Sequence, residues 1–162
     1  MKSINVFDPV STCRIQFSKD FTFNDLTAVL PYLEKLGIRT IYASPVFKAI
    51  PGSEHGYNVI NPVEINPEIG TADELKGLKK ELQKHAMGWV QDIVPNHMAY
   101  DPRNEWIDDI FRKGPHSEYY NYFDIDWEHH LDELKGKVLL PFFGKPLQAL
   151  IDNNELTVKF GD

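Results

Sequence analysis

Hydrophobic and polar positions follow two different periods along the first hundred residues. Thr12 to Phe17 (TCRIQF) alternates at every second position, with Arg14 and Gln16 on one side, which is typical of a short strand. Apolar residues then recur at helical spacing, as Leu26, Val29, Leu30, Leu33 and Leu36, before a glycine stop at Gly37. Two further short, β-branched runs, Ile38 to Ser44 (IRTIYAS) and Met87 to Val94 (MGWVQDIV), predict a second and a third strand.

Between the last two strands lies a helix with a clear start. Thr71 and Glu74 fit a capping box, in which the hydroxyl and the carboxylate each serve a free backbone N–H. An apolar stripe of Leu75, Leu78, Leu82 and Ala86 follows. In the first helix Pro31 interrupts the pattern, so it predicts either a kink or the start of the regular part.

The order strand, helix, strand, helix, strand predicts an α/β fold with a parallel sheet and right-handed crossovers. Ligands of such folds bind at the carboxyl ends of the strands. The second strand runs into SPVFKAIPGSEHGYNVINP and the third into PNHMAYDP. We therefore expect both turn-rich loops to open on one face and to carry the site.

Composition narrows the possible partners. The 162 residues carry 17 basic and 24 acidic side chains, a net charge of 17 − 24 = −7, and no basic stripe, so nucleic acid is not expected as a partner. Cys13, the single cysteine, excludes an internal disulfide and is expected to be a small buried residue. No run approaches 18 apolar residues and no signal-peptide core begins the chain, so neither a membrane nor export is expected, and we predict a cytoplasmic protein.

Asp92 stands among apolar neighbours, where an ionised carboxylate needs a partner. One interpretation is a structural acceptor for Arg14 or for a backbone turn. The other uses Asn96 and His97, since a carboxylate, an amide and an imidazole at one strand end can bind the hydroxyls of a sugar.

The segment DIVPNH, Asp92 to His97, resembles the first sequence signature of the α-amylase superfamily, glycoside hydrolase family 13, whose catalytic domain is a (β/α)8 TIM barrel. Together with TCRIQF, YASPVFKAIPGSEHGYNVINP, NPEIG and GPHSEYYNYFDIDW, in that order, the chain resembles the N-terminal part of the maltooligosyl trehalose synthases, roughly from Thr12 to Phe160.

The resemblance implies roles for the candidate substrate-binding residues. It makes Tyr57 a stacking platform for the sugar at the cleavage subsite, and His55 and His97 contacts to sugar hydroxyls. By the same resemblance Asn96 and Asp92 organise the site, and Arg14 approaches the catalytic carboxylate region. The structural alternative is that Gly52 and Gly56 make turns and Tyr57 caps the core. Two positions depart from the family pattern, because Cys13 replaces an aromatic residue and Asn58 replaces an aspartate.

Chain length limits what the resemblance can imply for catalysis. A (β/α)8 barrel takes about 250 residues, and residues 1–99 account for about three βα units. We expect residues 100–162 to be the insert that follows the third barrel strand. We expect it to contain a helix at Glu105 to Arg112 and strands at Val138 to Phe143 and Leu156 to Phe160, and we interpret the carboxylates of Asp124, Asp126 and Glu128 as solvated or turn-forming. The aromatic residues Tyr119, Tyr120, Tyr122, Phe123 and Trp127 either pack in its core or line a sugar groove, and His129 and His130 lack metal-site spacing.

In the family, the nucleophile, the acid/base and the third acidic residue lie on later strands. We therefore expect no catalytic residue in this chain, no metal and no cofactor, and no activity of the chain alone. The implied parent reaction is an intramolecular transglucosylation, which converts the reducing-end α-1,4 bond of a maltooligosaccharide into an α,α-1,1 bond.

Two alternatives stay open, namely an α-glucan hydrolase of the same superfamily and a non-catalytic module for sugar binding or assembly. A partial barrel also leaves a sheet edge unpaired, which predicts self-association.

Overall fold

The computed structural model describes residues 9–140 and 143–157, which fall into two compact units that divide between Asp108 and Asp109. In chain order the first unit holds β1 (Thr12–Ile15), α1 (Phe23–Lys35), β2 (Thr40–Ala43), β3 (Phe47–Ala49), β4 (Val59–Ile65), α2 (Ala72–Lys84) and β5 (Gly88–Gln91). The helix α3 (Glu105–Lys113) crosses into the second unit, which continues with the 3-10 turn η1 (Gly114–His116) and the helix α4 (Leu147–Asp152).

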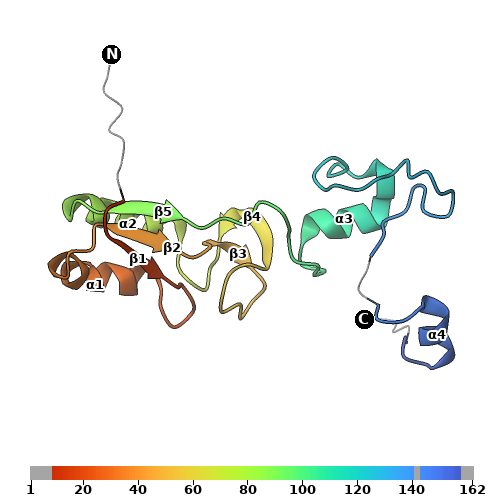
Figure 1. Cartoon of the computed structure of the whole chain (residues 1–162), viewed down its shortest axis with the longest axis horizontal. Helices are drawn as coiled ribbons and strands as arrows, with labels where there is room; N and C mark the ends of the chain where they lie inside the picture. Colours follow the sequence, from red (N-terminus) through yellow and green to blue (C-terminus); the bar gives the residue numbers. More distant parts are fainter. Residues whose placement is uncertain (1–8, 141–142, 158–162) are drawn as a thin grey trace, which may run out of the picture. The chain divides into compact units, whose positions relative to one another are not determined.

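The strands β1, β2 and β5 lie side by side in one parallel sheet, as Figure 1 shows. One face of this sheet packs on the helices through a cluster that includes Ile41 and Ala43, with Cys13, Ile15 and Trp89 against it. Helix α1 contributes Phe23, Leu26 and Leu30, all fully buried, and α2 contributes Leu78 and Leu82. The predicted α/β fold with parallel strands is confirmed, although each strand is shorter than its apolar run.

Helix α1 begins three residues before the predicted apolar stripe. The Thr22 hydroxyl accepts a hydrogen bond from the Asp25 N–H at 3.4 Å, and the Asp25 carboxylate accepts one from the Thr22 N–H at 2.8 Å. This is a second capping box, with aspartate in the place of glutamate. The helix continues through Pro31, so the prediction that Pro31 marks its start is wrong.

The capping box of α2 is confirmed. The Thr71 hydroxyl accepts from the Glu74 N–H at 3.2 Å, and Glu74 accepts from the Thr71 N–H at 2.6 Å. The other carboxylate oxygen of Glu74 accepts from the amide of Asn24 on α1, at 2.6 Å. The cap therefore also ties the two helices together.

A hairpin of β3 and β4, which the sequence patterns did not indicate, stands between β2 and α2. Its strands are antiparallel, and the register shifts between Phe47 and Lys48 and again between Lys48 and Ala49. Lys48 pairs with Glu64 across it at 2.8 Å. Residues 50–58 form the loop of this hairpin. The SEHGYN stretch, residues 53–58, therefore lies at a hairpin tip and is not a simple strand-to-helix connection.

The second unit has little regular structure. The predicted helix in this region is confirmed as α3, but the predicted strand at Val138 to Phe143 is wrong for residues 138–140, which form no strand. Of the last predicted strand, Leu156 and Thr157 are irregular, and the rest lies outside the described residues, as do positions 141–142. None of the helices in the described ranges has the length and apolar character that a membrane crossing requires.

Candidate functional site

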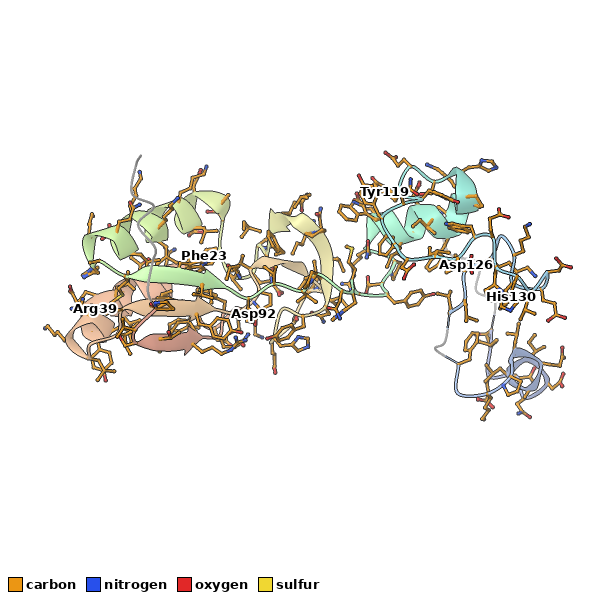
Figure 2. All side chains as sticks on the ribbon, turned by 45° about the horizontal axis from the view of Figure 1, so that its top comes forward. Phe23, Arg39, Asp92, Tyr119, Asp126 and His130 are labelled. Atoms are coloured by element: carbon orange, nitrogen blue, oxygen red, sulfur yellow. The ribbon has the colours of Figure 1, made fainter. Side chains whose placement is uncertain are left out.

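Three parallel strands bring their carboxyl ends to the same edge of the sheet. Asp92 directly follows β5, and its N–H donates to the carbonyl of Ala43 at the end of β2, at 2.9 Å. Figure 2 shows Asp92 beyond the end of β5, at the opposite end of the sheet from Arg39. The polar side chains of the candidate site therefore meet at the carboxyl ends of the parallel strands, which is the edge that the sequence predicted.

Arg14, Tyr57 and Asp92 form a closed triangle of hydrogen bonds at this edge. The Tyr57 hydroxyl donates to Asp92 Oδ2 at 2.6 Å, and Arg14 Nη1 donates to the same oxygen at 3.1 Å. Arg14 Nη2 donates to the Tyr57 hydroxyl, also at 3.1 Å. The structural interpretation of Asp92, as an acceptor for Arg14, is correct, and the carboxylate additionally holds the tyrosine.

These contacts perturb two pKa values. The hydrogen bond from Tyr57 and the guanidinium of Arg14 lower the pKa of Asp92, against an opposing effect of burial. The hydrogen bond to the Asp92 carboxylate raises the pKa of Tyr57, because ionising the phenol would place two negative charges together. At neutral pH the triangle therefore holds an anionic Asp92 and a neutral, hydrogen-bond-donating Tyr57.

Arg14 is held from the sheet as well. It faces Tyr42 across the β1–β2 register, and its guanidinium carbon lies 4.6 Å from the centre of the Tyr42 ring, a cation–π contact. Gln16, two residues along on the same side of the chain, accepts from Arg14 Nη2 at 3.5 Å. The sequence patterns did not assign Tyr42 or Gln16 to the site. The alternation of side chains along TCRIQF does, however, place Gln16 on the same side of the chain as Arg14.

The hairpin loop that presents Tyr57 is tightly constrained. Gly56 has a φ of +76°, and an added Cβ there would come within 3.0 Å of the Pro45 carbonyl oxygen, so a side chain is disfavoured at this position. The Ser53 hydroxyl accepts from the Gly56 N–H at 3.0 Å and donates to Asn58 Oδ1. Asn58, which replaces the aspartate of the family pattern, thus anchors the loop as a neutral acceptor.

The two histidines flank Tyr57. The ring of His55 lies nearly parallel to the Tyr57 ring, with 5.7 Å between centroids, and its Nδ1 accepts from the Tyr57 N–H at 3.0 Å. His97 Nε2 lies 3.2 Å from the Tyr57 carbonyl, and its Nδ1 lies 3.2 Å from Asn96 Oδ1. All six predicted binding residues are therefore brought into one hydrogen-bonded group.

The arrangement offers one ring and several polar groups to a ligand. Tyr57 is 37% exposed as a residue, and its hydroxyl is occupied by Asp92 and Arg14, so the ring is the feature it can offer to a ligand. Exposed His55, His97 and Asn96 surround it. An aromatic ring beside hydroxyl-binding groups suits the apolar C–H face and the polar rim of a pyranose.

The described residues hold no cluster of three or more histidine, cysteine, aspartate or glutamate side chains that could bind a metal ion. In the second unit Asp124, Asp126 and Glu128 are exposed, as predicted, and Glu128 pairs with Lys135 at 2.9 Å. Trp127 is buried and stacks on Tyr120, with 5.5 Å between the ring centroids, which favours packing over a sugar groove for that pair.

Several solved structures that are similar to this chain belong to one group of enzymes. A crystal structure of maltooligosyl trehalose synthase is 39% identical, with a TM-score of 0.79 over 93% of this chain and 20% of the other. The maltooligosyltrehalose synthase from Arthrobacter ramosus is 41% identical, with a TM-score of 0.70 over 74% of this chain and 16% of the other.

A curated relative from Mycobacterium tuberculosis (strain H37Rv), whose name refers to the same enzyme, is 38% identical over 145 residues, 85% of this chain and 18% of the relative. The chain thus spans about a fifth of the length of the proteins it matches. Its resemblance to the N-terminal part of the maltooligosyl trehalose synthases is confirmed, as is the relation of its α/β fold to the TIM-barrel enzymes. The family model for the alpha amylase catalytic domain matches residues 18–147 of this sequence. The chain therefore belongs to that family.

Proposed function

We propose that this chain contributes part of the glucan site of an enzyme that converts the reducing-end α-1,4 bond of a maltooligosaccharide into an α,α-1,1 bond. The observation that carries the proposal is the Tyr57 ring, fixed through its hydroxyl by Asp92 and Arg14 and left accessible beside His55 and His97. The names of its similar structures support the reaction assigned to the parent enzyme.

In this proposal Tyr57 stacks on the sugar at the cleavage subsite, and His55 and His97 bind its hydroxyls. Asp92, Asn96 and Arg14 act as positioning residues. Asp92 and Arg14 hold the Tyr57 phenol, and Asn96 Oδ1 faces the His97 ring. No cofactor takes part in this role.

The chemistry itself requires groups beyond this site. Retaining glycoside chemistry uses a nucleophilic carboxylate and an acid about 5 Å apart. Asp92 is unsuited to act as a general acid because its lowered pKa leaves it ionised at neutral pH, and its Oδ2 is occupied by two donors. We therefore propose that the catalytic carboxylates belong to later barrel strands and that this chain alone is inactive.

The binding part of the proposal can be tested on the chain itself. Maltopentaose is titrated into the purified chain and into its Tyr57→Ala and Tyr32→Ala variants, with binding followed by calorimetry. Tyr32 is an exposed tyrosine on α1 and serves as the matched control. The proposal requires binding that Tyr57→Ala weakens and Tyr32→Ala does not. Equal binding by all three proteins would refute the role of Tyr57.

An α-glucan hydrolase is the second candidate, and the match to the alpha amylase catalytic domain supports it equally. The two reactions differ in their products. An enzyme that contains this chain and forms the α,α-1,1 bond removes reducing ends without releasing glucose, whereas a hydrolase releases glucose and creates new reducing ends. Assays of glucose and of reducing ends on the same maltopentaose digest distinguish them.

We further propose that the chain self-associates through its sheet edges and resides in the cytoplasm. In the described sheet β1 and β5 each pair on one side only, and unpaired edges template association. The lone Cys13, half-buried and unbridged, is compatible with a reducing compartment. A sedimentation experiment that gives a monomer mass at every concentration would contradict self-association.

A further inference from the structure

Gln91, the last residue of β5, directly precedes Asp92 and has a fully engaged side chain. Its amide nitrogen donates to the Asp92 carbonyl at 2.8 Å and to the carbonyl of Ser44, the first residue after β2, at 3.0 Å. Its amide oxygen accepts from the indole N–H of Trp89 at 3.2 Å. Side chains alternate along a strand, so Gln91 shares the face of Trp89, which packs against the buried cluster.

The three partners of Gln91 fix the orientation of its amide. Two of them are carbonyl oxygens, which only accept, and the third is an indole N–H, which only donates. A flipped amide would place its oxygen against both carbonyls and its nitrogen against the indole, so one orientation satisfies all three partners. A carboxylate of the same shape cannot take this place, because it has no donor for the two carbonyls.

Ser44 carries the connection onward to β1. It is fully buried, and its N–H donates to the carbonyl of Ile15, the last residue of β1, at 2.9 Å. Its hydroxyl accepts from the Phe17 N–H, also at 2.9 Å. Since its carbonyl accepts from Gln91, this one serine is tied both to the end of β1 and to the end of β5. Loss of the Gln91 donor would leave that buried carbonyl without this hydrogen bond, which is costly.

Arg14 and Asp92 reach each other across the end of β2. They belong to β1 and to the residue after β5, and each of these strands pairs with β2 and not with the other. The gap that their ion pair spans is therefore set where β2 ends, at Ser44, which Gln91 binds.

Both peptide groups that flank Asp92 are held at this point. Its N–H donates to the Ala43 carbonyl at 2.9 Å, and its carbonyl accepts from Gln91. A residue has only two soft backbone dihedrals, so fixing the peptide groups on both sides fixes the direction of its Cβ. The amide of Gln91 therefore helps to aim the Asp92 carboxylate at the hydroxyl of Tyr57.

We propose that Gln91 is a positioning residue of the glucan site, which acts through Ser44 and the backbone of Asp92. It sets how Asp92 meets Arg14 across the end of β2, and thereby holds the ring of Tyr57 where a sugar stacks. The inference rests on the proposed function, since it takes the same maltooligosaccharide as ligand.

The first test replaces the amide with an apolar side chain of similar size. Gln91→Leu should raise the pKa of Asp92 in the folded chain toward its ordinary range, read by carboxyl ¹³C titration, because the carboxylate is no longer aimed at its two donors. The same variant should bind maltopentaose about three- to tenfold more weakly in calorimetry. Gln83→Leu, at an exposed glutamine of α2, is the matched control and should change neither value.

A second variant tests the amide donors themselves. Gln91→Glu keeps the shape but has no donor when ionised, so at about pH 8 it should weaken maltopentaose binding by about three- to tenfold. At about pH 5 protonation of the new carboxyl, favoured by the two carbonyls it faces, restores one donor and should recover part of the loss. Asp92 stays ionised over this range because its pKa is lowered. Each affinity is compared with that of the unmodified chain at the same pH, which removes the response of the other ionisable groups.

The outcomes separate this inference from the proposed function. If the unmodified chain does not bind maltopentaose, the proposed function fails, while the Asp92 titration of Gln91→Leu needs no sugar and still decides whether Gln91 aims the carboxylate. If Gln91→Leu lowers only the free energy of unfolding and leaves the pKa of Asp92 and the affinity unchanged, the positioning role is refuted. A relative affinity of Gln91→Glu that does not respond to pH would also refute it, and this variant stays informative should Gln91→Leu lose the dispersed spectrum of a folded chain.

Discussion

The two units of this chain differ in how their residues are held. The first unit has a parallel sheet and two capped helices around a shared cluster of twelve buried apolar residues. The described part of the second unit has short helices and turns, and only Ile110, Ser117, Trp127 and Leu150 are buried there. The comparison shows that the candidate site is built in the unit that holds the core, from strand β1, the β3–β4 hairpin loop and the loop after β5.

The largest predicted effect breaks the core of the first unit. Leu26→Ala empties a fully buried position on α1 and should lower the free energy of unfolding by about 2–5 kcal/mol. The matched change in the second unit is Leu131→Ala, at a position that is 49% exposed, which should cost less than about 0.5 kcal/mol. Urea melts of the two variants measure both values, and equal costs would contradict the difference between the units.

The next effect weakens a helix start. Thr71→Ala removes a hydroxyl that caps α2 and should cost about 0.5–2 kcal/mol. Thr71→Ser keeps the hydroxyl and should recover most of that stability. If the serine variant is as unstable as the alanine variant, the cap is not the source of the stability.

A smaller effect concerns the charge triangle and its pH dependence. The folded pKa of Asp92 is lowered, so the carboxylate contributes stability that is present above its unfolded pKa of about 3.9 and is lost as the pH falls through the folded value. Arg14→Gln should raise the pKa of Asp92 and reduce this acid-dependent contribution. Carboxyl ¹³C titration reads the pKa, and an unchanged value would contradict the ion pair.

The smallest effect concerns the pair of Asp101 and the exposed Arg103 in the loop after β5. Two donors of Arg103 lower the pKa of Asp101 to about 2. Arg103→Gln should raise this pKa toward its ordinary range, with a stability difference that is fully present above about pH 4, shrinks as the pH falls from about 4 to about 2, and is absent below that. A pKa of Asp101 that stays near 2 in this variant would show that another group lowers it.

Patterns in the sequence predicted the structural elements that depend on neighbouring residues, such as helices, caps and strand order. The apolar stripes and the Thr71 box located both helices, and the parallel order placed Tyr57 and Asp92 at one edge. The β3–β4 hairpin was not predicted because β3 has only three residues and its pairing with β4 is irregular. A strand of this kind leaves no alternating apolar and polar run in the sequence. The capping box at Thr22 was not predicted because Asp25 occupies the position where the usual motif has glutamate or glutamine.

The geometry of the site could be predicted only in part. Because Asp92 has apolar neighbours in the sequence, its carboxylate was expected to have a hydrogen-bond partner, and Arg14 was one of the candidates. The contact between Tyr57 and Asp92 joins positions 35 residues apart, and the hydrogen bond that the Gly52 N–H donates to Glu68 depends on the hairpin. Long-range contacts of this kind depend on the fold and leave no periodic signal in the sequence.

The most direct test of the central claim is an amide NMR titration of this chain with maltopentaose. We predict a dispersed spectrum in which the amides of residues 53–58 and 92–97 shift with sugar, while those of residues 109–157 stay in place. Dispersed peaks that do not move around Tyr57 and Asp92 at millimolar sugar would contradict the claim that this edge of the sheet binds a glucan.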